Sequence, residues 1–184
     1  NIKASRYLPS EGITEQYRQC FELTLEEVEK DSSLKRKLVA IVTSAGDPRG
    51  YAPRIKEAGI KWIHKITAPR QLERLLREGL RPDAVIAMGY AAAAHIGWAH
   101  LDSIVLIPSV VAVARNEGIP VIASGGYCDG VSLVAALALG ADGVEIGTRF
   151  MCSKEADYHP NIKELVAKVG VLDTTIIAGM MTDM

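Results

Sequence analysis

Glycines stand at the ends of two short apolar runs, where their backbone amides could bind an anion. The run 121–123 is followed by Ser124, Gly125 and Gly126, and the run 143–146 is followed by Gly147 and Thr148. Consecutive glycines let the backbone approach a ligand closely and aim N–H groups at it. A phosphate held between two such loops would gain several charge-assisted hydrogen bonds. Tight strand-to-helix turns use the same residues without a ligand, so the pattern alone leaves both interpretations open.

A histidine follows a third apolar run. His95 lies seven residues after Met88, the last residue of the run 83–88. An imidazole titrates near neutral pH and could serve as a general base. A loop histidine bonded to the backbone is the other interpretation, and one unpaired histidine does not decide between them. We expect His64, His100 and His159 to be structural.

Other kinds of catalytic site lack their residues. No spacing of Cys, His and Asp resembles a metal site, so no metal is expected, and no G-x-S-x-G elbow is present. The three cysteines, Cys20, Cys128 and Cys152, are odd in number and widely spaced. This pattern argues against a disulfide framework and fits a reducing cytoplasm, where we expect the protein to be located.

The composition is that of one ordinary globular domain. The chain has 184 residues, of which 48% are hydrophobic and 23% charged. A formal charge of −1 argues against nucleic acid and anionic membranes as partners, and no apolar run approaches the ~20 residues of a membrane span. We expect a small-molecule substrate, with the oligomeric state open and a homo-oligomer included. Because the chain starts at Asn1 and not at Met, we expect a fragment.

The elements that position these residues alternate between strands and helices. Near-continuous apolar runs predict buried parallel strands. These runs cover residues 38–43, 60–66, 83–88, 119–124 and 142–147. They mostly recur about every 23 residues, the length of one βα unit. Helices are predicted at 14–30, from Pro69 to Gly79, from Pro108 to Gly118, at 130–139 and at 160–169.

Strict alternation allows a doubly wound sheet or a (β/α)₈ barrel. No G-x-G-x-x-G follows the first strand, which weakens the dinucleotide-binding version. A barrel typically needs about 250 residues, so this interpretation predicts a TIM-barrel segment that lacks its first strands. We expect residues 1–184 to form one such N-terminally truncated domain, with a C-terminal helix and tail at 151–184.

These segments, in this order, resemble those of the nitronate monooxygenase family, formerly called the 2-nitropropane dioxygenases. The same superfamily includes the flavin-dependent enoyl-ACP reductases. The match runs from about Leu38 to Ile176 and is most specific over 119–150. Its strongest parts read IPVIASGG at 119–126, Asp129-Gly130, AALALGADGV at 135–144 and GTRF at 147–150.

The resemblance implies an FMN-dependent TIM-barrel oxidoreductase. Gly125, Gly126, Gly147 and Thr148 match the positions that hold the FMN phosphate. Gly89, Ser124, Glu145 and Ile146 match positions against the cofactor. His95 matches the family's catalytic histidine.

Two departures from the family pattern bear on activity. The loop that usually reads G-x-E-A-G-G-H-x-G here carries alanine at positions 91–94, and alanines favour a helix. Glu145 stands where the family often has Gln. We therefore weigh three functions: oxidation of alkyl nitronates with O₂, NAD(P)H-dependent reduction of an enoyl thioester or quinone, and ligand binding by a degenerate barrel without turnover.

Overall fold

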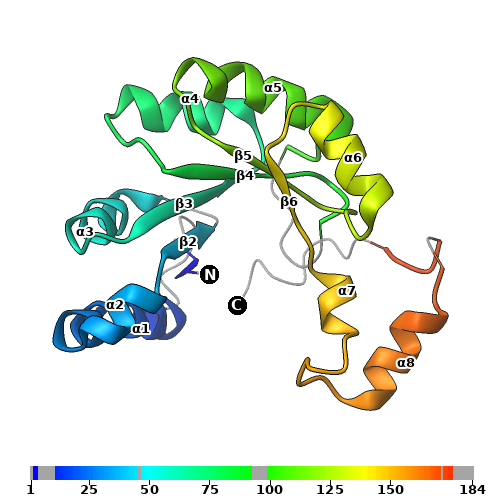
Figure 1. Cartoon of the computed structure of the whole chain (residues 1–184), viewed down its shortest axis with the longest axis horizontal. Coiled ribbons are helices and arrows are strands. Elements are labelled where there is room, and N and C mark those ends of the chain that lie inside the picture. Colours follow the sequence, from blue (N-terminus) through cyan, green and yellow to red (C-terminus); the bar gives the residue numbers. More distant parts are fainter. Residues whose placement is uncertain (1, 4–10, 45–46, 93–98, 171, 176–184) are drawn as a thin grey trace. The chain divides into compact units, whose positions relative to one another are not determined.

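Six strands form one sheet in which each strand pairs in parallel with the next strand along the chain (Figure 1). The computed structural model describes residues 2–3, 11–44, 47–92, 99–170 and 172–175. The strands are β1 (Ile2–Lys3), β2 (Ala40–Ser44), β3 (Lys61–Ile66), β4 (Ala84–Met88), β5 (Val121–Ser124) and β6 (Gly143–Glu145). The sequence-predicted strands and their parallel pairing are confirmed.

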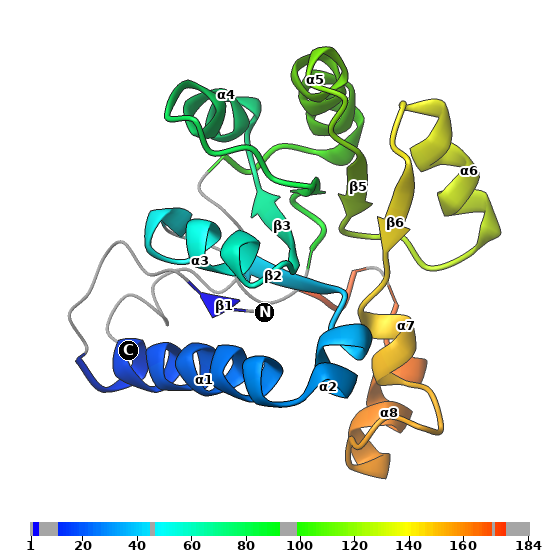
Figure 2. The ribbon, with the colours of Figure 1, turned by 60° about the vertical axis from the view of Figure 1, so that its left-hand side comes forward.

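The chain divides into two compact units, Asn1–Glu145 and Ile146–Met184. The first contains the whole sheet, whose strands follow one another around an arc (Figure 2). Three helices of this unit follow the strands as βα crossovers: α4 (Pro69–Arg77), α5 (Ser103–Asn116) and α6 (Gly130–Ala138). They pack on one face of the sheet, called here the outer face, and the opposite face is the inner face.

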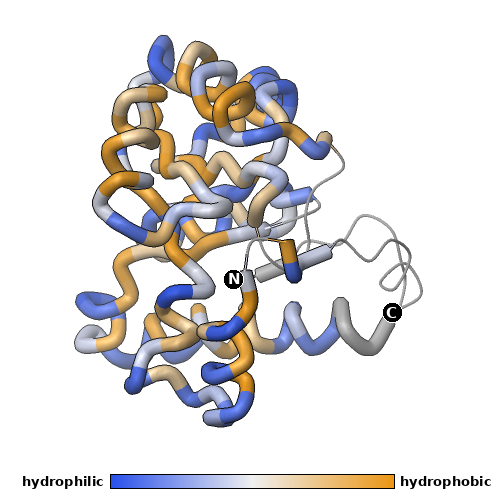
Figure 3. Tube along the Cα trace, turned by 90° about the vertical axis from the view of Figure 1, so that its right-hand side faces the viewer, coloured by the Kyte–Doolittle hydropathy of each residue, from blue (hydrophilic) through white to orange (hydrophobic). Residues whose placement is uncertain are grey.

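Residue alternation decides which side chains meet the helices. On β4 and β5, Val85, Ala87, Val121 and Ala123 lie in the outer-face core with Leu106 and other residues of α4 to α6. Neighbours in a strand point to opposite faces, so Ile86, Met88, Ile122 and Ser124 lie on the inner face. Figure 3 shows the alternation of hydrophobic and hydrophilic residues along the helices that this packing requires.

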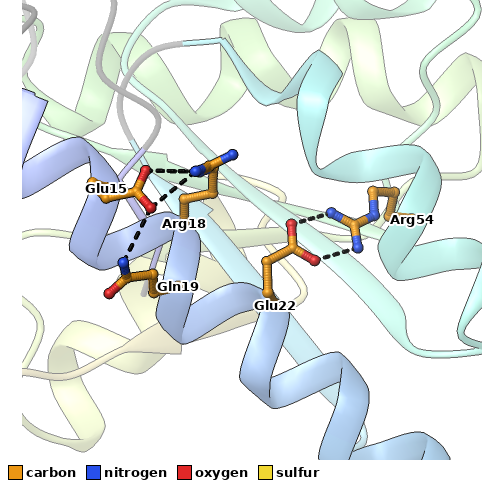
Figure 4. A network of polar contacts seen from close by, with 5 residues as sticks. All are labelled: Glu15, Arg18, Gln19, Glu22 and Arg54. Carbon is orange, nitrogen blue, oxygen red and sulfur yellow. Dashed lines mark hydrogen bonds and ion pairs between the residues drawn. The ribbon is translucent and has the colours of Figure 1, made fainter.

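A second core cluster joins β2 and β3 to α1 (Glu11–Lys30), α3 (Ala52–Glu57) and Leu75 of α4. The short elements α2 (Ser32–Lys37) and η1 (Pro48–Gly50) contribute no residue to it. Phe21 of α1, Ile55 of α3 and Trp62 of β3 are its largest buried side chains. At its rim, Glu22 of α1 binds the guanidinium of Arg54 through two hydrogen bonds (Figure 4). This hydrogen-bonded cation lowers the pKa of the Glu22 carboxyl.

One detail of the helices differs from the sequence-based expectations. Helix α5 begins at Ser103, so Pro108 lies inside it and does not open it. Pro108 is exposed, so the carbonyl that its missing N–H leaves unpaired faces water, and the helix tolerates it. On α6 the buried residue is Ala136, whereas Leu133 and Leu137 are exposed. On α1, Cys20 is exposed, while Phe21, Leu25 and Val28 form the buried stripe.

The described residues of the second unit form two helices, α7 (Thr148–Met151) and α8 (Pro160–Lys168). His159 caps α8 by accepting a hydrogen bond from the Asn161 N–H at 3.2 Å, which confirms its structural role. The Lys163 ammonium donates hydrogen bonds to the carbonyls of Ser153 and Ala156, and these bonds stabilise the loop between α7 and α8. Ile162 and Leu165 of α8 are exposed.

Candidate functional site at the carboxyl ends of the strands

The loop after β5 has the backbone conformation that only glycine adopts freely. Gly125 and Gly126 have φ angles of +104° and +82°. Among the described residues, neither of their N–H groups donates a hydrogen bond to the protein. A Cβ at Gly126 would meet only the Ala91 side chain, at 3.4 Å. The loop therefore presents two free donors, as the sequence predicts for an anion site.

Gly125 has a second reason to be glycine. A Cβ there would lie 2.8 Å from the backbone nitrogen of Ala92 and 3.1 Å from the carbonyl oxygen of Gly89. The loops after β4 and β5 are thus in direct backbone contact. The Gly89 N–H also donates to the Ser124 carbonyl at 2.9 Å, which joins the two strand ends.

The loop after β4 is held from its other side by α5. A Cβ at Gly89 would lie 2.4 Å from the hydroxyl of Ser103, the first residue of that helix. The close approach of α5 is therefore enough to require a glycine at position 89, and no ligand is needed to explain it. Ala91 and Ala92 are not helical, contrary to what the alanine run favours. Ala93, Ala94 and the catalytic candidate His95 lie outside the described residues.

An ion pair and a hydroxyl lie on the inner face at the ends of three strands. The Lys65 ammonium of β3 is 2.6 Å from Glu145 Oε1 of β6, and the Ser124 hydroxyl of β5 donates to Glu145 Oε2 at 2.7 Å. Ser124 and Glu145 are directly paired in the sheet, so their side chains share one face. Strands β4 and β5 separate β3 from β6, and the curved sheet brings the Lys65 and Glu145 side chains together across its interior.

Burial makes this cluster electrostatically significant. The Lys65 side chain is 12% exposed and that of Glu145 34%, and Ser124 is 6% exposed. A largely buried ammonium is costly unless a carboxylate compensates it, and a partly dehydrated pair interacts more strongly than a surface pair. Sequence reasoning singled out Ser124 and Glu145 and missed Lys65. Its signal is a lysine one residue from the end of a strand in which alternate residues are buried.

The remaining candidates lie in the second unit. Ile146 is partly buried, Gly147 precedes α7 and Thr148 begins it, and both Gly147 and Thr148 are exposed. A Cβ at Gly147 would meet nothing within 4 Å, so neither packing nor a positive φ requires glycine here. This segment has open backbone, which a ligand could approach.

His64 is structural, as expected. Its Nδ1 lies 2.7 Å from the Thr43 hydroxyl, which also accepts a hydrogen bond from the Trp62 indole N–H at 2.8 Å. Burial lowers the pKa of His64 to about 4, so the imidazole is neutral at pH 7. His100 has a φ of +43°, and its ring makes an edge-to-face contact with Tyr90. Among the described residues it has no catalytic partner.

The described part of the chain holds little else that could do chemistry. No group of three or more His, Cys, Asp or Glu side chains there could hold a metal ion. No helix there is long and apolar enough to cross a membrane. Cys20 and Cys128 are exposed thiols and Cys152 is partly buried, and none is disulfide-bonded.

Comparison with known proteins agrees with the sequence resemblance. The family model described as nitronate monooxygenase matches residues 6–181. A (3aS,4S,5R,7aS)-5-hydroxy-7a-methyl-1-oxo-octahydro-1H-indene-4-carboxyl-CoA dehydrogenase of Mycobacterium tuberculosis is 37% identical over 124 residues, 67% of this chain and 34% of that protein. A probable nitronate monooxygenase of Staphylococcus aureus is 31% identical over 155 residues, 79% of this chain and 42% of that protein.

A solved structure of FabK from Thermotoga maritima superposes with a TM-score of 0.67 at 39% identity, covering 77% of this chain and 43% of that one. The chain thus spans less than half the length of the relatives it matches. The expected fold class, a segment of a (β/α) barrel, is confirmed. From its family match and its parallel strands in chain order, the chain belongs to the nitronate monooxygenase family.

Proposed function

We propose that this chain forms part of an FMN-dependent oxidoreductase that acts on a small molecule. The observation that carries the proposal is the pair of free N–H groups at Gly125 and Gly126, directly after the buried strand β5. The last residue of that strand, Ser124, belongs to the polar cluster on the inner face. The family match and the relatives named as monooxygenase and dehydrogenase support this class of activity.

The described residues fit a flavin phosphate. Gly125 and Gly126 are successive residues of a turn with positive φ, and successive backbone N–H groups in a turn can bind one anion. Gly126 leaves room where a side chain would stand, with only Ala91 in contact distance. On this proposal Gly125 and Gly126 hold the phosphate, and Gly147 and Thr148 contribute the donors of the following strand's loop.

The chain's own residues would have distinct tasks around the ring. Bound FMN would supply the capacity to accept and pass on electrons. Ser124, Glu145 and Ile146, with Gly89 in the adjoining loop, would line the flavin, and the apolar side chains of Ile86 and Met88 share the inner face with them. His95 would hold or remove a substrate proton, because imidazole has a pKa near the working pH.

For the substrate we propose an alkyl nitronate or nitroalkane, with O₂ as the electron acceptor. The 31% identity to a protein named nitronate monooxygenase supports this choice. A second candidate is an NAD(P)H-dependent reductase of an enoyl thioester or quinone. The 37% identity to a protein named as a CoA dehydrogenase favours it, because that name places a thioester in the substrate.

Anaerobic mixing of the FMN-loaded protein with each electron donor tests the proposal. Loss of flavin absorbance on adding an alkyl nitronate, with no change on adding NADH or NADPH, is the expected result. Rapid bleaching by NADH or NADPH alone would favour the reductase. A protein that binds FMN yet is reduced by none of these donors would support the third function, ligand binding without turnover.

A further inference from the structure

The ion pair between Lys65 and Glu145 determines how much positive charge the inner face presents to a ligand. Lys65 and Glu145 are the only charged side chains on this face at the carboxyl ends of β2 to β6, the strands whose side chains are described. Their Nζ–Oε1 distance of 2.6 Å makes the pair neutral as a unit. The second carboxylate oxygen is occupied by the Ser124 hydroxyl.

We propose that Glu145 is a positioning residue that neutralises Lys65 and so weakens the site's attraction for anions, including the FMN anion. The inference rests on the proposed function, since it takes FMN as the ligand. A glutamine at this position would keep the shape and the hydrogen bond from Ser124, and would leave the Lys65 ammonium uncompensated. The carboxylate therefore sets the charge of the site, while the amide would satisfy the same geometry.

Glu145 and Lys65 carry opposite charges on the same face, so removing each charge must change FMN affinity in opposite directions. Removing the Glu145 charge alone should strengthen FMN binding, because a buried ammonium then attracts the anion without competition. Removing the Lys65 charge alone should weaken it, because Glu145 would then repel the anion. Once Lys65 is gone, the Glu145 substitution can only relieve that repulsion.

The test is FMN affinity, measured by fluorescence quenching on the intact protein after its flavin has been removed. We compare the parent with Glu145→Gln, Lys65→Met and the double variant. Glu78→Gln is the matched control, because it removes a carboxylate from an exposed ion pair with Arg74 on α4. Circular dichroism checks that each variant is folded.

We expect Glu145→Gln to lower the Kd for FMN at least tenfold and Glu78→Gln to leave it unchanged. Lys65→Met should raise the Kd at least tenfold, and the double variant should recover most of that loss. The two-electron potential of the bound flavin should also rise in Glu145→Gln, because the uncompensated Lys65 ammonium favours the more negative, reduced flavin.

Equal Kd values and potentials for the parent and Glu145→Gln would overturn this inference while leaving FMN binding, and hence the proposed function, intact. A double variant that binds FMN as weakly as Lys65→Met would also overturn it, because the Glu145 charge would then not oppose binding of the anion. Absence of FMN binding in the parent and in Glu145→Gln alike would overturn the proposed function and this inference with it.

Discussion

The carboxylate of Asp142 accepts a hydrogen bond from the backbone N–H of Val121 at 2.8 Å, and the Asp142 N–H donates back to the Val121 carbonyl at 2.7 Å. Asp83 makes the same pair of bonds with Trp62, at 2.9 and 2.8 Å. In both cases the aspartate precedes a strand and holds the beginning of the strand before it. The contacts lie at the amino ends of the strands, away from the candidate site, where barrel residues serve stability.

Replacing Asp142 by Ala should therefore destabilise the fold without changing FMN affinity. The substitution leaves the Val121 N–H without its charged acceptor, a loss of about 1–3 kcal/mol in the free energy of unfolding. Urea denaturation measures the change. Asp102→Ala is the control, since Asp102 caps α5 without a side-chain hydrogen bond. This variant should lose at most about 0.5 kcal/mol in the free energy of unfolding. Equal losses in both variants would show that the contact with Val121 contributes nothing.

The buried His64 should make stability depend on pH. Its pKa is about 4 in the folded chain and about 6.5 when unfolded, so the unfolded state binds more protons between these values. Stability is then fully present above about pH 6.5 and falls as the pH drops toward 4, by about 3 kcal/mol in total.

Urea denaturation at several pH values between 7 and 4 checks this expectation. His64→Gln should be less stable than the parent at pH 7, because it disturbs the packing around Thr43 and Trp62. It should nevertheless show a shallower pH dependence, since its side chain does not titrate. An unchanged slope in this variant would assign the pH dependence to other groups.

The two glycines after β5 should differ in their tolerance of alanine. Gly125→Ala would place a Cβ 2.8 Å from the Ala92 nitrogen at a positive φ, so the loop after β4 must move. We expect a loss of about 2–3 kcal/mol, against about 1 kcal/mol for Gly126→Ala, where the main cost is the φ angle.

Gly50→Ala is the matched control for this pair, because nothing lies within 4 Å of its Cβ position and its φ is not positive. Thermal unfolding ranks the three variants. A Gly125→Ala variant as stable as Gly50→Ala would contradict the backbone contact between the two loops.

His95 should act on substrates that still carry the proton. His95→Asn should slow turnover of a neutral nitroalkane by about 10²- to 10⁴-fold, the usual contribution of a general base. Turnover of the nitronate, which has already lost that proton, should fall much less. Steady-state kinetics on both substrates measure the contrast. Equal losses would remove His95 from the base role.

Much of the fold is readable from the sequence because its signals are local. The apolar runs predicted the strands. The ends of the helices before β4, β5 and β6 are marked by glycines with positive φ, at Gly79, Gly118 and Gly140. The glycine loop at 125–126 was predicted for the same reason, since its conformation depends on its own residues.

Features that depend on the curvature of the sheet were not readable in this way. Lys65 and Glu145 are 80 positions apart and two strands lie between theirs, so their contact exists only once the sheet curves. The start of α5 was also missed, because proline usually opens a helix, and here Pro108 is tolerated on the exposed side.

The central claim is that the glycine loop after β5 binds the FMN phosphate, and FMN binding to Gly126→Leu tests it most directly. A leucine at this position would fill the space beside Ala91 and the free N–H groups, whereas Gly50→Leu would not reach the site. Equilibrium dialysis of the parent and both variants against FMN should show binding to the parent and to Gly50→Leu and none to Gly126→Leu. Parent-level flavin content in a folded Gly126→Leu protein would contradict the account.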